Sequence, residues 1–211
     1  MTVQISAFSW VPKGARGLVK DLRVRWALEE SGIAYEEHLT LPRGECPDEY
    51  RQWQPFGQVP AYRDDRVEMF ESGAIVLHIA RDNPVLSPPD RNGQARMESW
   101  VFAALSTIEP RLQGIFLIDD ALAATPEGAA FKTRMSELLA NRLGVLSNCL
   151  GANEYLLGQI HRCGHHDGNR AARCAGTRPA GALAGTDGLC GTMRSPSGIC
   201  TGAGRADGQL R

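Results

Sequence analysis

Apolar residues change their spacing several times in the first part of the chain. Val3 to Phe8 are apolar or small at strand-type spacing, which predicts a strand. A loop with Trp10 follows, and the apolar positions from Leu18 to Ser31 then recur at roughly helical intervals. Gly32 stands where a helix C-cap is expected, because glycine adopts the left-handed backbone conformation without a steric cost. The pattern predicts a strand followed by a helix.

Shorter periodic runs complete this part of the chain. They predict a strand from Ile33 to about Leu41, a short helix from Pro47 to Trp53, two short strands at Val59 to Arg63 and Val67 to Phe70, and a helix from Ser72 to Ala80. The order is therefore βαβ, helix, ββα. A parallel strand pair plus a hairpin, closed by a helix, predicts one mixed sheet covered by helices.

Strand patterns stop after this point. Residues 83–90 are rich in proline and polar residues, which is typical of a linker. Two longer stretches, 91 to about 117 and 126 to about 150, combine good helix formers with apolar repeats. We therefore expect an α/β domain at 1–82, a linker at 83–90 and a partial all-α domain at 91–158.

Charge and composition narrow the function classes. The chain has 211 residues and a formal net charge of -1, with acids and bases interspersed, so it offers no basic stripe for nucleic acid. It has no apolar run of about 18 residues for a membrane span, and its start lacks the pattern of a signal peptide. Its six cysteines form no CxxC pair. We expect a cytoplasmic protein that binds neither membrane nor nucleic acid.

Two short segments carry the functional signal: Gln54 to Tyr62, with the letters QPFGQVPAY, and Phe70 to Ile75, with the letters FESGAI. Together with Val24 to Glu30 and Gly32 to Glu36, they resemble the N-terminal domain of soluble glutathione transferases. The resemblance extends in order and spacing over about residues 3 to 157. It implies a thioredoxin-like first domain, a helical second domain and a homodimer. It also implies glutathione as co-substrate rather than a cofactor, and a small hydrophobic electrophile as its partner.

The Val59-Pro60 pair has its own physical logic. Proline cannot donate a ladder hydrogen bond, and a bond before proline adopts the cis form far more readily than other peptide bonds. A cis Pro60 would turn the N–H and C=O of Val59 outward, where an extended peptide such as glutathione could pair with them. The alternative is that Pro60 only opens an edge strand.

Ser72 is expected to N-cap the helix that follows it, next to helix N–H groups that suit a carboxylate. The family resemblance implies that Glu71 and Ser72 hold the γ-glutamyl end of glutathione, with the acid binding its ammonium group. The alternative is an ordinary cap beside a solvated acid, and the two roles are compatible. Gln58 is expected to hydrogen-bond the other end of the peptide.

The resemblance also implies attack by the glutathione thiolate on an electrophilic carbon. A free thiol has a pKa of about 8.5, so the site must favour the anion. Ser9, directly after the first strand, is the candidate catalytic hydroxyl donor, helped by the N-terminus of the first helix. The loop from Trp10 to Lys20 lacks the compact serine or cysteine cluster often seen in the family, so Trp10 or a backbone N–H is an alternative. A non-catalytic glutathione-binding or regulatory protein is therefore the alternative function.

The composition changes abruptly after Gly158. Residues 159–211 hold eleven of the 23 glycines and four of the six cysteines but no aromatic residue. Neither helical nor strand periodicity continues, so we expect a low-complexity tail that buries little apolar area. Its potential metal ligands fit no zinc-module spacing, and we predict no metal site, although a metal-binding protein remains a third class to test. They are His161, Cys163, His165, His166 and Cys174.

We hypothesise that a shifted reading frame accounts for this tail. Read one nucleotide later, the codons of Gln159 to Arg173 permit the string RFTAADIMMATVLR, which resembles the family's next helix with its Thr-x-x-Asp box. The same shift over Leu189 to Cys200 permits YVARCEARPAF, which resembles the family's late helices. We predict a one-nucleotide insertion or sequencing error near codon 158. Because the lost helices line part of the family's second-substrate pocket, we expect intact glutathione-site residues but reduced or absent turnover.

Overall fold

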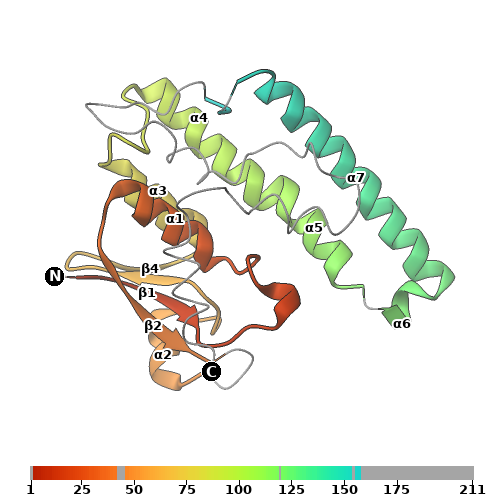
Figure 1. The fold of residues 1–211 in the computed structure, drawn as a ribbon, viewed down its shortest axis with the longest axis horizontal. Coiled ribbons are helices and arrows are strands. Elements are labelled where there is room, and N and C mark those ends of the chain that lie inside the picture. The colour runs from red at the N-terminus through yellow and green to blue at the C-terminus, as the bar shows by residue number, and fades with distance from the viewer. Residues whose placement is uncertain (1, 42–45, 119, 154, 158–211) are drawn as a thin grey trace. The chain divides into compact units, whose positions relative to one another are not determined.

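The computed structural model describes residues 2–41, 46–118, 120–153 and 155–157 (Figure 1). These residues divide into two compact units, with the boundary between Ser87 and Pro88. The predicted tail at 159–211, its frame shift and its potential metal ligands lie outside the described residues.

The first unit is built on a four-stranded sheet with the order β2-β1-β3-β4. The strands are β1 (Val3–Phe8), β2 (Tyr35–Thr40), β3 (Ala61–Arg63) and β4 (Glu68–Phe70). β1 pairs in parallel with β2 and antiparallel with β3, which forms a hairpin with β4. The predicted mixed sheet of a thioredoxin-like domain is confirmed.

Two helices cover one face of this sheet. Helix α1 (Asp21–Ser31) and helix α3 (Ser72–Arg81) pack against each other and lie side by side in Figure 1. Their buried residues form one core with two strand residues, and full burial of such a side chain contributes about 1.5–3 kcal/mol. The core members are Ile5, Val24, Ala27, Leu28, Tyr62, Ile75 and Ile79.

The opposite face carries the short helix α2 (Asp48–Trp53). Its residues Tyr50 and Trp53 are buried with Cys46 and with Ala61 of β3. The indole Nε1 of Trp53 donates a 3.0 Å hydrogen bond to the carbonyl of Tyr62, which ties α2 to the sheet. Successive strand residues point to opposite faces, so Ile5 belongs to the α1 and α3 core and Ser6 faces α2.

The ends of α1 show how far the local pattern predicts a boundary. The predicted C-cap at Gly32 is confirmed, since Gly32 has a left-handed backbone with φ 67° and its N–H bonds back to the carbonyls of Glu29 and Leu28. The start is later than the predicted Leu18. The backbone turns at Gly17, with φ 80°, and a short 3₁₀ turn η1 (Lys13–Ala15) lies before it. Apolar spacing alone did not locate this turn.

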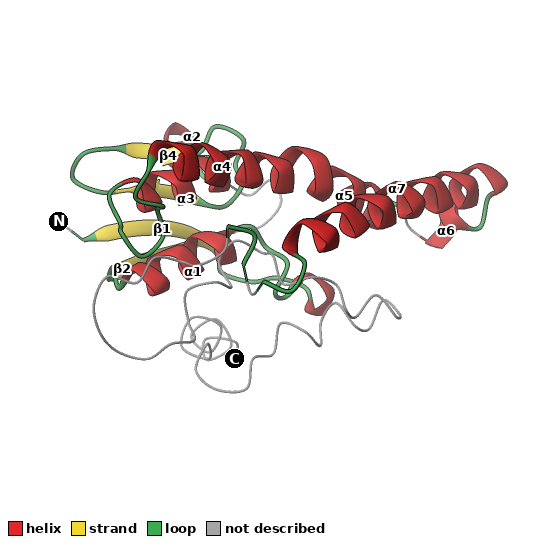
Figure 2. Ribbon diagram, turned by 90° about the horizontal axis from the view of Figure 1, so that it is seen from above, coloured by secondary structure: helices red, strands yellow, loops and turns green. Residues whose placement is uncertain are grey.

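The second unit is helical, as predicted. It contains α4 (Arg91–Phe102), the π-helical segment η2 (Ala103–Ile108), α5 (Glu109–Phe116), α6 (Asp120–Ala123) and α7 (Pro126–Leu150). Helix α7 packs against α5, and Figure 2 shows the two running side by side. The side chains of Asp90 and Thr125 cap α4 and α7 by accepting hydrogen bonds of 2.9 Å and 3.1 Å from Gly93 and Gly128.

The predicted helical stretch at 91 to about 117 is confirmed, and it contains the π-helical segment η2. The N–H of Glu109 bonds to the carbonyl of Ala104, five residues back, and the next residue is Pro110, which has no N–H to donate. A proline at this point removes one helical hydrogen bond, and the ladder shifts to the wider π spacing before it. In the described part of the chain, no helix combines the length and apolar character needed to cross a membrane.

Candidate functional site

The predicted site residues come from one edge of the sheet. Because β1 runs antiparallel to β3, the end of β1 lies beside the start of β3. The pairing of Ala61 with Phe70 brings the end of β4 to the same edge. Ser9 follows β1, Val59 and Pro60 precede β3, and Glu71 follows β4. The topology therefore gathers segments that are far apart in the sequence.

The Val59-Pro60 peptide bond is cis, as expected from the sequence. The side chain of Val59 is buried. Among the described residues, neither the N–H nor the C=O of Val59 has a hydrogen-bond partner. Strand β3 begins only at Ala61, two residues later than predicted. A peptide group just before a strand that has no partner among the described residues is able to pair with an extended ligand.

The predicted N-cap role of Ser72 is wrong. The cap position of α3 is Glu71, whose side chain makes no capping hydrogen bond, and Ser72 is already the first helical residue. An N-cap residue needs a non-helical backbone to turn its side chain back onto the helix end, which Ser72 does not have. Its side chain is buried, yet its hydroxyl has no hydrogen-bond partner among the described residues.

The first turn of α3 therefore keeps unsatisfied donors. The first α-helical hydrogen bond closes at Ile75, whose N–H bonds to the carbonyl of Glu71 at 3.0 Å. The N–H groups before Ile75 have no helical acceptor, and the helix dipole adds positive potential there. Together with the unpartnered Ser72 hydroxyl, these groups offer hydrogen bonds to a carboxylate.

Glu71 has an unusual backbone for a residue with a side chain. Its φ is 70°, and it is the one non-glycine residue with positive φ in the described ranges. Such a conformation costs about 1–3 kcal/mol and persists only where the surrounding structure holds it. The side chain is exposed, next to the uncapped start of α3. Because strained backbone angles cluster at functional sites, the strain marks Glu71 as a candidate functional residue.

Ser9 and Gln58 lie at the same edge with exposed side chains. The N–H of Ser9 donates a 2.8 Å bond to the carbonyl of Thr40, which fixes the backbone just after β1. Trp10, the alternative to Ser9, is 54% exposed. The carbonyl of Gln58 accepts a 2.6 Å bond from the phenol of Tyr50.

Two residues beneath the site were missed by the sequence reasoning. Ser6 is fully buried in the middle of β1, and Tyr50 is buried on α2. Their hydroxyls lie 2.6 Å apart. A serine between Ile5 and Ala7 in a mostly apolar strand is the signal that could have drawn attention to Ser6, since a buried hydroxyl needs a partner. Nothing in the sequence distinguishes Tyr50 from an ordinary core aromatic residue.

Comparisons with known proteins find glutathione transferases among the proteins similar to this chain. A family model described as the glutathione S-transferase N-terminal domain matches residues 22–89. Glutathione S-transferase 3 of Schizosaccharomyces pombe is 26% identical over 155 residues, which cover 66% of this chain and 64% of that protein. Glutathione S-transferase F10 of Arabidopsis thaliana is 30% identical over 141 residues, which cover 63% of this chain and 66% of that protein. The chain thus spans less than two thirds of either relative.

A solved structure shows the same fold. It is that of a glutathione transferase family member from Pseudomonas fluorescens with two glutathione molecules bound. The TM-score is 0.64 at 21% sequence identity, and the match covers 75% of this chain and 70% of that one. Residues 22–89 are therefore similar to the N-terminal domain of glutathione S-transferases, and the fold is that of a glutathione transferase.

The family model covers some of the predicted site residues and not others. Val59, Pro60, Glu71 and Ser72 lie inside the matched range of 22–89. Ser9 lies before it, in the segment whose loop departs from the family pattern. The residues predicted to bind glutathione therefore rest on a firmer resemblance than Ser9, the predicted catalytic hydroxyl.

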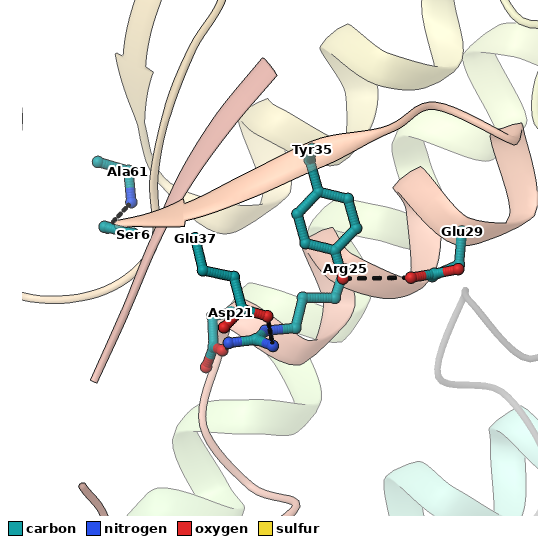
Figure 3. Close-up of polar contacts among 7 residues, drawn as sticks. All are labelled: Ser6, Asp21, Arg25, Glu29, Tyr35, Glu37 and Ala61. Carbon is teal, nitrogen blue, oxygen red and sulfur yellow. Dashed lines mark hydrogen bonds and ion pairs between the residues drawn. The ribbon is translucent and has the colours of Figure 1, made fainter. Parts of the chain in front are cut away.

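The chain also carries a buried charge network between α1 and β2 (Figure 3). Arg25 donates a 2.8 Å bond to Asp21 and a second bond to Glu37 of β2. Burial raises the pKa of Asp21, and the Arg25 charge opposes that rise. The network joins α1 to β2 and so has a structural role. Within the described ranges, no three His, Cys, Asp or Glu side chains gather to hold a metal ion.

Proposed function

We propose that this protein binds glutathione at the sheet edge formed by Val59, Pro60, Glu71 and Ser72. The observation that carries the proposal is the unpartnered Val59 peptide at the same edge as the uncapped start of α3. The cysteinyl backbone of glutathione would pair with Val59 like an added strand. Its γ-glutamyl carboxylate would accept bonds from the Ser72 hydroxyl and the first N–H groups of α3.

Charge complementarity orients the tripeptide. The γ-glutamyl end of glutathione carries an ammonium group beside its carboxylate, and Glu71 would pair with that ammonium. Gln58 would hydrogen-bond the glycine end of the tripeptide. This arrangement accounts for an acidic residue held at an unfavourable backbone angle next to a helix N-terminus that favours anions.

The proposed reaction is conjugation of glutathione to a small hydrophobic electrophile. The thiol loses its proton to solvent, and the thiolate sulfur forms a bond to the electrophilic carbon. With an aryl halide, the carbon–halogen bond breaks and the halide leaves with the electron pair. Ser9 would donate a hydrogen bond to the thiolate and lower its pKa from about 8.5. By family resemblance, the working form is a cytoplasmic homodimer that takes part in detoxification.

A glutathione titration followed by calorimetry tests the binding step. We expect saturable binding that Ser72→Ala and Glu71→Gln each weaken by about tenfold, the loss of roughly one charge-assisted hydrogen bond. Absence of binding to the folded protein would contradict the proposal. Ultraviolet difference spectra of bound glutathione would then report the thiolate and its pKa.

A rate assay with glutathione and a reactive aryl halide tests the chemical step. We expect slow or absent turnover by this chain and faster turnover by a version whose reading frame is restored after Gly158. Ser9→Ala should lower the rate of the restored version and raise the pKa of bound glutathione. Binding with an unshifted thiol pKa and no turnover in either version would favour the alternative, a non-catalytic glutathione-binding protein.

A further inference from the structure

A continuous line of hydrogen bonds runs beneath the Val59-Pro60 segment. The N–H of Ala61 donates to the hydroxyl of Ser6 at 2.6 Å. The hydroxyls of Ser6 and Tyr50 lie 2.6 Å apart, and the phenol of Tyr50 reaches the carbonyl of Gln58 at 2.6 Å. The line thus joins the backbone on both sides of Val59 and Pro60. Figure 3 shows the link between Ser6 and Ala61.

The direction of each bond follows from the inventory of donors. A carbonyl only accepts, so Tyr50 uses its single proton on Gln58. The hydroxyl of Ser6 must then donate to the oxygen of Tyr50 while it accepts from the Ala61 N–H. All three bonds point the same way, and each polarises the next one in a chain buried from water.

Peptide geometry connects this line to Val59. The carbonyl of Gln58 and the N–H of Val59 belong to one planar trans peptide, in which the two groups point in opposite directions. Tyr50 holds the carbonyl toward the buried side of the segment. The N–H of Val59 must therefore point away from Tyr50. Neither Tyr50 nor Ser6 needs to touch a ligand to have this effect.

We propose that Tyr50 and Ser6 are positioning residues that aim the Val59 N–H at the backbone carbonyl of bound glutathione. This inference rests on the proposed function, because it assigns a role within the same site. Tyr50 of α2 and Ser6 of β1 are a buried pair. They set the affinity for glutathione through the peptide between Gln58 and Val59. Ala61, held by Ser6, fixes the far side of the segment in the same way.

The protonation of Tyr50 is compatible with this role. Burial raises the pKa of its phenol to about 12, although the bond from Ser6 opposes the rise. The phenol therefore remains a donor to Gln58 throughout the pH range of any glutathione assay. Ionisation of Tyr50 should therefore add no pH dependence to the glutathione Kd between pH 6 and pH 9.

Glutathione titration of Tyr50→Phe and Ser6→Ala tests the proposal, with Tyr62→Phe as the matched control. Tyr62 is also a buried tyrosine, but its phenol bonds to Asp64 in the turn at the opposite end of β3. We expect Kd to rise about fivefold or more in Tyr50→Phe and Ser6→Ala, the loss of about one hydrogen bond, and to change less than twofold in Tyr62→Phe. The double variant should lose less than the product of the two single effects.

Amide nuclear magnetic resonance of the ligand-free protein supplies a second readout. The Val59 and Ala61 amide signals should move in Tyr50→Phe and stay in place in Tyr62→Phe, which loss of stability alone would not produce. If Tyr50→Phe is too unstable to titrate, Ser6→Ala carries the test. An unchanged Kd in folded variants of a wild type that binds glutathione would overturn this inference alone. A wild type that fails to bind glutathione would overturn the proposed function, and this inference with it.

Discussion

The phenol of Tyr62 donates a 2.8 Å hydrogen bond to the Oδ2 atom of Asp64, at the turn between β3 and β4. The same carboxylate accepts bonds of 2.8 Å and 2.9 Å from the N–H groups of Arg66 and Val67. Burial raises the pKa of Asp64, but these bonds outweigh it and hold the pKa at about 2. The turn is therefore closed by an ionised side chain.

This lowered pKa predicts how stability depends on pH. The folded pKa lies below the unfolded value of about 3.9, so the carboxylate stabilises the fold fully above about pH 4, and the effect is lost as pH falls toward 2. Asp64→Asn should lower the free energy of unfolding at pH 7 by about 1–2 kcal/mol, with the difference shrinking toward pH 2. Urea denaturation over this range is the measurement. A difference that does not vary with pH would contradict the assignment.

Ser72 should matter for the ligand and little for the fold. Since its hydroxyl caps nothing in the described residues, Ser72→Ala should change the free energy of unfolding by less than about 0.5 kcal/mol while weakening glutathione binding. Thr125→Ala is the matched control, because Thr125 does cap a helix. It should cost about 1 kcal/mol and leave the glutathione Kd unchanged. Denaturation measures the free energy of unfolding of both variants, and titration measures their glutathione Kd. If Ser72→Ala instead lowered stability and left the Kd unchanged, Ser72 would be restored to a capping role.

At position 71, glycine should give a more stable protein than alanine, which is the reverse of the usual order of these two residues. At φ 70° a side chain is strained, so Glu71→Gly should be more stable than Glu71→Ala by about 1 kcal/mol. Both variants should lose glutathione affinity to a similar extent, because both lack the carboxylate. Thermal unfolding and calorimetry together measure this. A more stable alanine variant would mean that the backbone at this position is not strained.

Arg25 is expected to be critical for folding through its buried partners. Arg25→Met leaves the carboxylates of Asp21 and Glu37 without their cation and should cost about 3–5 kcal/mol. Adding Asp21→Asn and Glu37→Gln to that variant should recover part of the loss. Arg134→Met, which breaks an exposed pair with Glu137, should change stability by less than about 1 kcal/mol. Similar costs for Arg25→Met and Arg134→Met in urea denaturation would contradict a buried network.

The spacing of apolar residues and the glycine positions located the helices and strands, because interactions between residues close in the sequence decide where these elements form. The period of apolar residues separated the α/β unit from the helical one, and Gly32 marked the end of α1 through its left-handed backbone. The same patterns failed where a boundary depends on backbone angles. The strained angle of Glu71 places the cap position one residue before Ser72, and the hydrogen bonds on either side of Pro110 divide the long helix. Neither effect is visible in residue spacing.

The sequence by itself determined the order of the elements, the resemblance to glutathione transferases and the identity of the residues proposed to bind glutathione. Only the tertiary structure decided that Ser9, Val59 and Glu71 follow or precede strands at one edge of a sheet, because strand pairing joins residues that are far apart in the chain. It also revealed Ser6 and Tyr50 beneath Val59, 44 positions apart in the sequence. A hydrogen bond needs two groups within about 3 Å, and no periodicity along a chain encodes that distance between remote residues.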